Sequence, residues 1–459
     1  MNIQEERKLQ VEIAKLARER LFNDKAADFT GILILEAGKQ IDLYESDYEM
    51  IFKQENNFLY FTGCHEPGYV AVLDFDNKKY YLCPPRQSPA LEMWCGPNPS
   101  IESTMEKYQP DESMFADDII EFIKTDLKPS AIHAVKHTTS ADIMSKLQFE
   151  WNLEDIEWQM NECRLYKFAQ EIEWLRKAAV LTSDGFRAAM KPIQPGTMEN
   201  AIEMRLWNEC RSQTPACRHY AFAPIAASGM NPATLHYVKN DDLIDTEKLF
   251  LLDAGAEYFG YAGDITRTFP PTGKFNEHQK NLYEVVLKAN VESIKMCKPG
   301  VLWEDVHILT ERIIAEGLIE LGILKGDLEE VLAKHVVNGF YLHGLGHLLG
   351  LAVHDVGGYP KGVERINRPG IMYLRMRRVL EEGMAMTTEP GCYFNDAFIQ
   401  PLLDNPETAM HIDTEVLAEY RKHVAGIRIE DDLLITSDGV EVMTNAPKTV
   451  EEIEAHMAQ

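Results

Sequence analysis

The chain has 459 residues, of which 45% are hydrophobic and 26% are charged, and its formal net charge is −27 at pH 7. The length favours two or three domains, and the negative charge argues against nucleic acid and anionic membranes as partners. No apolar run approaches the ~20 residues that are needed to span a bilayer.

The N-terminal segment, residues 1–20, is charged and has apolar residues at helical spacing. It lacks the apolar core of a signal peptide, so we expect a cytoplasmic protein. The eight cysteines form no CxxC pair, which is typical of unpaired thiols in a reducing compartment.

Residues 1–160 are predicted to form a mixed α/β domain. Residues 31–38 have a strand-like composition, and 69–84 indicate two strands joined at an Asp-Asn turn. Residues 113–127 are helix-periodic, and 130–135, which follow, are strand-like. This alternation favours a sheet covered by helices.

Residues 161–459 are predicted to form a second domain that begins with two helices, over 167–193 and 194–212. We expect Thr197 to be the N-cap of the second helix. Together the two domains place the chain in the α/β (α+β) class. Further strands and helices are predicted over 248–256, 264–270, 276–297 and 301–322.

From Gly339 onward the chain is rich in glycine and proline, with short strands. The tract 357–376 has little periodicity along its whole length. Loops of that length are usually functional or disordered.

Asp253 and Asp264 flank a glycine-containing segment that predicts a β-hairpin. Two carboxylates on paired strands can face each other across one ladder, and without a cation one of them would hold a proton. A metal ion removes that conflict. The alternative is that both aspartates are turn residues, which is a common use of aspartate.

His343 and His347 lie in the sequence HGLGH. Two histidines four residues apart on a helix could both bind a metal, but the intervening glycines disfavour a helix. We therefore expect a bend or a strand end, with one of the two histidines as a metal ligand. The alternative is a histidine packed in the core.

Glu389 and Glu430 are two further candidate ligands. Glu389 precedes a proline, which favours an extended backbone that can aim the carboxylate inward. In GIRIEDD apolar and charged residues alternate, so Arg428 and Glu430 share one strand face. Taken alone, Glu430 is equally explained by a solvent-exposed strand face.

Four carboxylates and one imidazole form a ligand set for two divalent cations, because the charges balance. Mostly oxygen ligands suit Mn²⁺, which we expect, while Zn²⁺, Co²⁺ and Fe²⁺ are also compatible. Two cations ~3.5–4 Å apart can share a bridging water, lower its pKa and polarise a carbonyl oxygen. The sequence therefore predicts hydrolysis of an amide. The five ligands are Asp253, Asp264, His347, Glu389 and Glu430.

In this order the five motifs resemble those of the pita-bread metallopeptidases, which include methionine aminopeptidase, aminopeptidase P and prolidase. The motif HDVGGYPKGVERINRPG, residues 354–370, is similar to that of the prolidases, which are Xaa-Pro dipeptidases. Residues 52–74 are similar to the N-terminal domain of prolidase and aminopeptidase P. The resemblance covers nearly the whole chain. It implies a creatinase/prolidase-like domain over 1–160 and a pita-bread catalytic domain over 161–459.

The resemblance also implies a role for each metal ligand. Asp253 would be a terminal ligand of one ion, and Asp264 and Glu430 would bridge both ions. His347 and Glu389 would complete the second metal site. Glu389 would in addition act as a proton shuttle.

Further residues would contact the substrate. His354 would support the tetrahedral intermediate, His236 would bind substrate on the other side of the cleft, and His343 would lie beside the metals. Arg375 would bind the free carboxylate of a dipeptide, which an arginine does with two parallel hydrogen bonds. Its alternative is a basic cluster that faces water. Arg428 would be a second arginine on the substrate side.

Three hypotheses for the function follow. The first is an Xaa-Pro dipeptidase, in which a hydroxide held by two metals attacks the scissile carbonyl. The second is an Xaa-Pro aminopeptidase, which removes the first residue from longer peptides. The third and remote one is a binding module that has lost its metals, against which the complete ligand set argues.

The resemblance further implies a homodimer with a small peptide substrate. One departure from the family is Phe222, where a tyrosine is common, and it puts the substrate contacts at that position in doubt.

Overall fold

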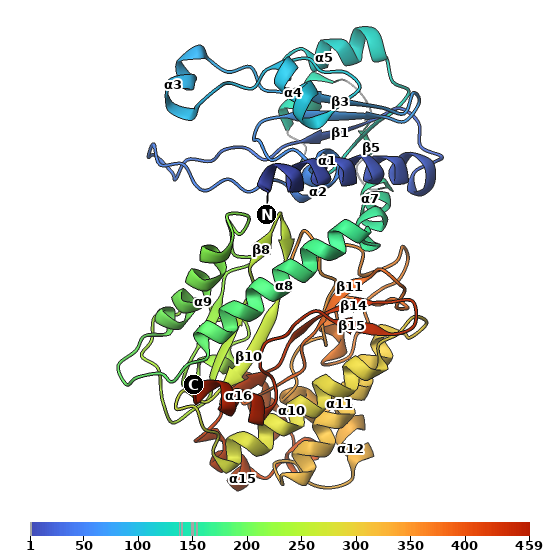
Figure 1. The fold of residues 1–459 in the computed structure, drawn as a ribbon. Coiled ribbons are helices and arrows are strands. Elements are labelled where there is room, and N and C mark those ends of the chain that lie inside the picture. Colours follow the sequence, from blue (N-terminus) through green and yellow to red (C-terminus); the bar gives the residue numbers. More distant parts are fainter. Residues whose placement is uncertain (1, 137, 139–140, 148–150, 153–154) are drawn as a thin grey trace. The chain divides into compact units, whose positions relative to one another are not determined.

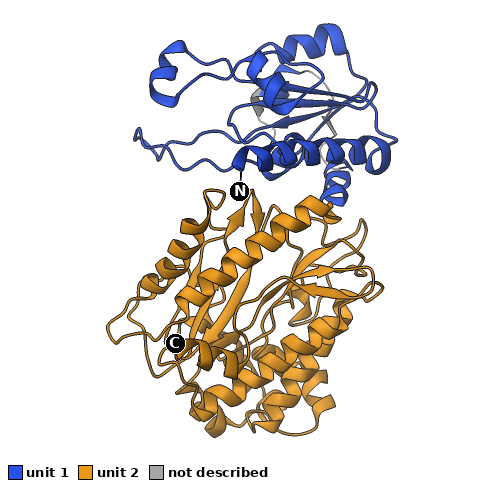
Figure 2. Ribbon diagram, in the orientation of Figure 1, with its two compact units in different colours: residues 1–164 blue, residues 165–459 orange. Residues whose placement is uncertain are grey.

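The chain forms two compact units, Met1–Arg164 and Leu165–Gln459 (Figure 2). Each unit combines helices with β-sheet, which confirms the predicted α/β class (Figure 1). None of the helices in the described part of the chain is long and apolar enough to cross a membrane. The computed structural model describes residues 2–136, 138, 141–147, 151–152 and 155–459.

The first unit is built on a five-stranded sheet in the order β3-β2-β1-β4-β5. β1 pairs antiparallel with β2 and parallel with β4. The strands predicted within 31–38, 69–84 and 130–135 are confirmed. The strands are β1 (Ile32–Glu36), β2 (Val70–Asp74), β3 (Lys79–Cys83), β4 (Ile132–Ala134) and β5 (Trp151–Asn152).

The helices of the first unit share an apolar core with this sheet. Ile119 and Ile123 pack in one buried cluster with side chains of β1, β2, β3 and β4. The helix predicted over 113–127 is confirmed only in its second half, where α5 continues into a π-helical turn, Ile123–Leu127. The helices are α1 (Ile3–Arg20), α2 (Asn56–Thr62), α3 (Glu92–Cys95), α4 (Ile101–Tyr108), α5 (Ile119–Phe122), α6 (Ala141–Lys146) and α7 (Asp155–Leu165).

The second unit contains two three-stranded sheets, in the orders β10-β7-β6 and β11-β14-β15. Two shorter pairs, β8-β9 and β12-β13, accompany them. An antiparallel bridge between Thr266 and Glu430 links β10 to the segment between β13 and β14. The strands are β6 (Ile225–Ala227), β7 (Phe250–Ala254), β8 (Glu257–Tyr258), β9 (Tyr261–Ala262), β10 (Ile265–Phe269), β11 (Ala385–Thr388), β12 (Gly391–Tyr393), β13 (Gly426–Arg428), β14 (Asp431–Ile435) and β15 (Val440–Val442).

In the helical part of this unit, α8 packs against α9 and α10 packs against α11. These four helices are the ones that the periodicity predicted. The N-cap prediction was wrong: α9 follows Met198, and the Thr197 hydroxyl donates to Gln194 O at 2.7 Å instead. The helices are α8 (Ala169–Ala189), α9 (Glu199–Gln213), α10 (Glu277–Met296), α11 (Trp303–Glu320), α12 (Leu328–Ala333), α13 (Asp396–Asp404), α14 (Pro406–Ala409), α15 (Thr414–Arg421) and α16 (Val450–Met457).

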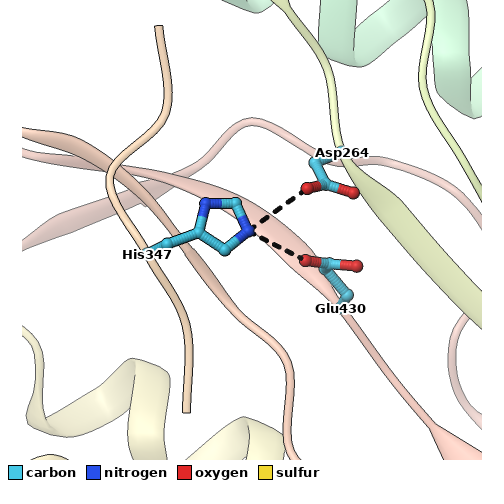
Figure 3. A group of neighbouring side chains, drawn as sticks. All are labelled: Asp264, His347 and Glu430. Carbon is cyan, nitrogen blue, oxygen red and sulfur yellow. Dashed lines mark ion pairs between the residues drawn. The ribbon is translucent and has the colours of Figure 1, made fainter. Parts of the chain in front are cut away.

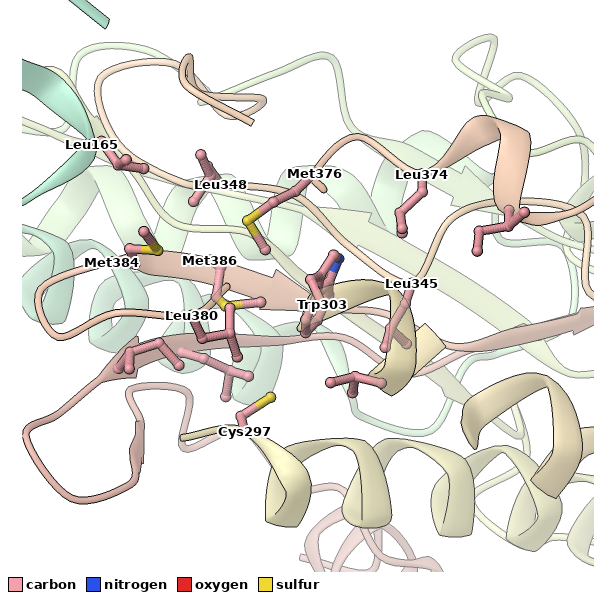
Figure 4. Close-up of a cluster of buried hydrophobic side chains, with 14 residues drawn as sticks. Leu165, Cys297, Trp303, Leu345, Leu348, Leu374, Met376, Leu380, Met384 and Met386 are labelled. Atoms are coloured by element: carbon pink, nitrogen blue, oxygen red, sulfur yellow. The ribbon is translucent and has the colours of Figure 1, made fainter. Parts of the chain in front are cut away.

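A buried apolar cluster joins regular elements of the second unit to its irregular segments (Figure 4). Trp303 enters it from α11 and Met386 from β11. Leu345, Leu374 and Met376 enter it from segments with little regular structure. Because each buried apolar side chain contributes ~1.5–3 kcal/mol, core packing fixes segments that lack the hydrogen bonds of a helix or strand.

Candidate metal centre

The hairpin of β7 and β10 brings Asp253 and Asp264 to one face. The two strands pair antiparallel, with Asp253 opposite Thr266. Cross-strand partners share a face, as do residues two apart on one strand, so both carboxylates and the Thr266 hydroxyl point the same way. A Cβ on Gly255 would lie 1.8 Å from Gly263 O, so the close approach beyond β7 requires glycine. The predicted hairpin is confirmed.

His347 lies in an irregular segment beside β11. Its carbonyl accepts a hydrogen bond from Thr387 N at 2.8 Å, and its own N–H donates to Thr387 Oγ1 at 3.3 Å. A Cβ on Gly346 would lie 2.2 Å from Thr387 O, so only glycine permits this approach. The segment is bent rather than helical, as the glycines of HGLGH predicted.

The backbone also fixes the two glutamates. Glu389 follows β11, and its N–H donates to Leu345 O at 2.8 Å. Glu430 N donates to Thr266 O at 3.1 Å, and Thr266 Oγ1 donates to Glu430 Oε2 at 2.7 Å. Glu430 is only 2% exposed, so it does not belong to a solvent-exposed strand face.

The side chains of Asp264, His347 and Glu430 converge (Figure 3). His347 Nε2 lies 3.3 Å from Asp264 Oδ2 and 4.0 Å from Glu430 Oε1. One ligand atom from each of these residues lies within 4.8 Å of the others, close enough to share one metal ion. Glu389 Oε1 lies 3.6 Å from His347 Nε2. Asp253 lies outside this group, and its Oδ2 accepts a hydrogen bond from Arg428.

The carboxylates of this group repel one another in a buried site. Burial and the charge of Asp253 raise the pKa of Asp264 well above its usual range. Burial and the neighbouring Asp264 have the same effect on the pKa of Glu430. Burial raises the pKa of Glu389 to about 7, against the opposing effect of His347. Such a cluster binds either protons or cations tightly.

Two further observations fit a pair of divalent cations. Asp253 Oδ1 is buried and accepts no hydrogen bond from any residue that the structure describes. His347 Nδ1 lies 3.0 Å from Leu348 O. Because the ring N–H donates there, Nε2 carries the lone pair that faces the carboxylates, as a metal-binding histidine requires. The donor set therefore suits cations that accept oxygen and imidazole ligands.

A hydrogen-bonded chain beside the ligands contains a residue that the sequence prediction missed. Arg428 donates to Asp253 Oδ2 at 2.5 Å and to Tyr393 Oη at 2.9 Å. Tyr393 Oη lies 2.8 Å from His343 Nε2. Tyr393 follows Glu389 at an even spacing in an extended segment, and that period of two is the signal that could have identified it.

Every residue predicted for the site lines one cavity of about 850 Å³. The rest of the lining is largely apolar, with Leu235 and Val353 among its residues. Phe222, where the sequence departs from the family, lines the cavity as well. The predicted residues in the lining are His236, Asp253, Asp264, His343, His347, His354, Arg375, Glu389, Arg428 and Glu430.

The histidines around the ligand group are neutral near pH 7. His354 packs edge-on against His347, with the ring centroids 4.4 Å apart. Burial and the neighbouring His347 lower the pKa of His354 to about 3. Burial and Arg428 lower the pKa of His343 to about 3, and burial also lowers the pKa of His236. These rings can exchange hydrogen bonds with a substrate without adding charge.

Arg375 reaches the cavity with its guanidinium uncommitted. Its side chain is exposed and forms no hydrogen bond or ion pair with another described residue. Arg377, two residues later, donates to Glu304 Oε2 at 2.6 Å. Arg375 is therefore available to an anionic ligand.

Comparison with known proteins gives the same picture. Residues 173–437 match metallopeptidase family M24, and residues 15–134 match the N-terminal domain of aminopeptidase P. The Xaa-Pro dipeptidase of Homo sapiens is 38% identical over 452 residues, which is 96% of this chain and 91% of that protein. A probable Xaa-Pro aminopeptidase of Talaromyces marneffei is 38% identical over 439 residues, which is 92% of each.

Solved structures are also similar. Aminopeptidase P from E. coli with the inhibitor Pro-Leu has a TM-score of 0.83 and 31% sequence identity, and the match covers 98% of both chains. Aminopeptidase PepP from Pseudomonas aeruginosa has a TM-score of 0.82 and 33% identity, with the same coverage. The matched domains, the near full-length relatives and the buried ligand group agree: the chain belongs to metallopeptidase family M24.

Proposed function

We propose that this protein is a metal-dependent dipeptidase that hydrolyses Xaa-Pro dipeptides. The observation that carries the proposal is Arg375, an uncommitted guanidinium in the wall of the cavity that holds the ligand group. A dipeptide presents a free carboxylate one residue beyond its scissile bond, and an arginine binds a carboxylate with two parallel hydrogen bonds. The name of the human relative, Xaa-Pro dipeptidase, supports the same substrate class.

For the metals, we propose two Mn²⁺ ions, because carboxylate oxygens dominate the donor set. Bound there, two cations would activate the attacking water and polarise the scissile carbonyl. The repulsion among the carboxylates and the orphaned Asp253 Oδ1 support this assignment. The residues that would hold the two ions are Asp253, Asp264, His347, Glu389 and Glu430.

The other residues of the cavity have separate roles in this proposal. Glu389 holds and moves a proton at the reacting atoms, which its raised pKa of about 7 favours. His354 and His343, both neutral, donate hydrogen bonds to the oxygen on which charge develops. His236 and Arg428 contact the substrate from the cavity wall.

The second candidate function is an Xaa-Pro aminopeptidase that acts on longer peptides. The names of the fungal relatives and of the solved structures favour it. The cavity of about 850 Å³ is also in the ~300–1,000 Å³ range of pockets that hold drug-sized ligands. The two functions share one metal centre and differ in whether Arg375 receives the end of the substrate.

A substrate panel separates these functions. With Mn²⁺ added, we expect Gly-Pro to be hydrolysed faster than Gly-Pro-Ala. Arg375→Ala should lower kcat/KM for Gly-Pro by about tenfold to a hundredfold, as expected for a lost charged hydrogen bond. Faster turnover of the tripeptide, with little effect of Arg375→Ala, would support the aminopeptidase. Absence of bound metal and of any peptidase activity would leave the binding module.

We also propose that the protein is a cytoplasmic homodimer. Tyr44 and Trp94 in the first unit are 93% and 77% exposed, and exposed large apolar side chains are typical of interaction surfaces. All eight cysteines are free thiols, which suits a reducing compartment. Light scattering on the purified protein should give twice the mass of the chain, and a monomer at micromolar concentration would contradict the dimer.

A further inference from the structure

Residues 356–377, the substrate segment, carry Arg375 to the cavity. Apart from the 3₁₀ turn Ile371–Tyr373, these described residues form no helix or strand. Their position must therefore come from contacts with the rest of the second unit. The segment has an apolar anchor and a polar anchor.

The apolar anchor flanks Arg375 on both sides. Leu374 and Met376 are fully buried in the cluster of Figure 4, whereas Arg375 is exposed. Residues two apart in an extended chain share a side, so the burial of these neighbours turns Arg375 the other way. A Cβ on Gly358 would lie 2.2 Å from Arg375 O, so the backbone at Arg375 is closely packed as well.

The polar anchor is Arg368, which binds Glu311 of α11. Arg368 Nη2 donates to Glu311 Oε2 at 2.8 Å, and Nη1 donates to Oε1 at 3.2 Å. Asn338 Nδ2 also donates to Glu311 Oε1, at 2.7 Å. Met372 N donates to Arg368 O at 3.0 Å, which connects the anchored residue to the 3₁₀ turn before Arg375.

Glu311 is an ionised group in a buried position. It is 4% exposed. Burial alone would raise its pKa, but the contacts with His307 and Arg368 outweigh burial and lower the pKa to about 2. A Cβ on Gly370 would lie 2.8 Å from Glu311 Oε1, so the substrate segment approaches this carboxylate at a glycine. A buried charge whose partner is removed is strongly destabilising, so this contact holds the segment in one place.

We propose that Glu311 is a positioning residue that fixes the substrate segment and holds Arg375 ready for the carboxylate of a dipeptide. The inference rests on the proposed dipeptidase function and adds a residue that sets its selectivity without touching the substrate. An arginine that is ordered before binding loses less conformational freedom when the substrate arrives, so affinity for the carboxylate is higher.

The first test is Glu311→Gln, which keeps the shape of the side chain and removes its charge. We expect KM for Ala-Pro to rise about tenfold, the effect of one weakened charged hydrogen bond, with kcat nearly unchanged. The preference for Ala-Pro over Ala-Pro-amide should fall by a similar factor, because the amide has no carboxylate for Arg375 to bind.

A double-mutant cycle tests whether Glu311 acts through Arg375. If it does, the variant carrying both Glu311→Gln and Arg375→Ala should have the KM of Arg375→Ala alone. A residue that only stabilises the fold would add its effect to that of Arg375→Ala. Additive effects on KM would therefore overturn the proposal.

Glu199→Gln is the matched control. Glu199 is fully buried and holds the segment around His236: it accepts hydrogen bonds from Ser228 N at 2.7 Å and from Tyr237 Oη at 2.8 Å. Its loss should change the rates for Ala-Pro and Ala-Pro-amide alike and leave their ratio near the wild-type value. The same shift of the ratio in this control would show that any buried glutamate produces it, and would overturn the proposal.

The remaining outcomes are also distinct. A folded Glu311→Gln protein with wild-type KM and a wild-type ratio overturns the positioning role. Should that variant not fold, Arg368→Lys gives the same readouts, because lysine keeps the charge but cannot form the two-point contact. A wild-type protein that prefers Gly-Pro-Ala to Gly-Pro contradicts the dipeptidase function itself, independently of Glu311.

Discussion

Arg428 and Asp253 form a buried ion pair across the metal-ligand group, with Arg428 Nη2 2.5 Å from Asp253 Oδ2. The two side chains are 4% and 10% exposed. The pair occupies one carboxylate oxygen and leaves Oδ1 without a hydrogen bond from the described residues. Asp253 is thereby oriented with a free oxygen on the side where a cation would bind.

Replacing Arg428 by Met should destabilise the metal-free protein strongly. Breaking a buried ion pair by removing one partner costs about 3–5 kcal/mol, and Asp253 would remain buried and charged. Added Mn²⁺ should recover part of the loss, because a cation compensates the same carboxylate. Urea unfolding with and without Mn²⁺ measures both effects. The control is Arg312→Met, since Arg312 pairs with Glu329 on the surface, where such pairs contribute about 0–1 kcal/mol. Equal losses in the two variants would contradict the prediction.

Removal of metal should lower the melting temperature of the wild-type protein. A cation that binds only the folded state stabilises it by about 2.7 kcal/mol at a hundred times its Kd, and the emptied site would leave the carboxylates to repel. Calorimetry before and after EDTA treatment, with metal content measured in both samples, checks this. An unchanged melting curve after confirmed metal loss would show that the ligand residues do not bind the ion together.

The metal-free protein should become less stable as pH rises toward neutrality. Glu389 has an ordinary pKa of 4.5 and a pKa of about 7 in the folded protein, so the folded state binds more protons than the unfolded chain between these values. Its stabilising contribution is complete below pH 4.5 and is lost as pH rises through about 7. Asp264 and Glu430, with raised pKa values, act in the same direction.

This pH dependence should disappear or reverse when Mn²⁺ is bound, since cation and protons compete for the same oxygens. Melting temperatures between pH 4.5 and 7.5, with EDTA or with Mn²⁺, give the two profiles. A metal-free profile that rises with pH throughout this range would contradict the buried repulsion.

Gly346→Ala should disturb the ligand His347 without introducing a charge. The new Cβ would lie 2.2 Å from Thr387 O, so either the segment or β11 must move. We expect a loss of about 1–3 kcal/mol, which is typical of overpacking, together with weaker metal binding. Gly439→Ala is the control, because a Cβ there meets no atom within 4 Å. If both variants melt alike, the segment is not held closely against β11.

Much of the regular structure follows from local pattern. The alternation in β7 and β10 and the periodicity of α10 and α11 specify these elements, because each buries one continuous face. The bend in HGLGH follows from glycine, which disfavours a helix. The five candidate ligands could be selected from sequence because carboxylates in such apolar contexts require compensation by a cation or a proton.

The rest depends on partners that are distant in sequence. Thr197 does not cap α9, because its hydroxyl binds Gln194 O instead. The roles of Glu311 and Tyr393 arise from contacts with Arg368 and Arg428, which no local pattern specifies. A polar residue read alone is ambiguous, since the same side chain serves as a surface charge or as a buried anchor depending on what the fold brings beside it.

The bridge between Thr266 and Glu430 has a consequence for measuring metal occupancy. Glu430 N–H donates to Thr266 O, while the side chain of Glu430 belongs to the ligand group and β10 begins directly after Asp264. An opening of this bridge would separate Glu430 from Asp264. The exchange rate of the Glu430 amide hydrogen with deuterium should therefore slow when a cation binds, so that one backbone position reports the state of the site without a substrate.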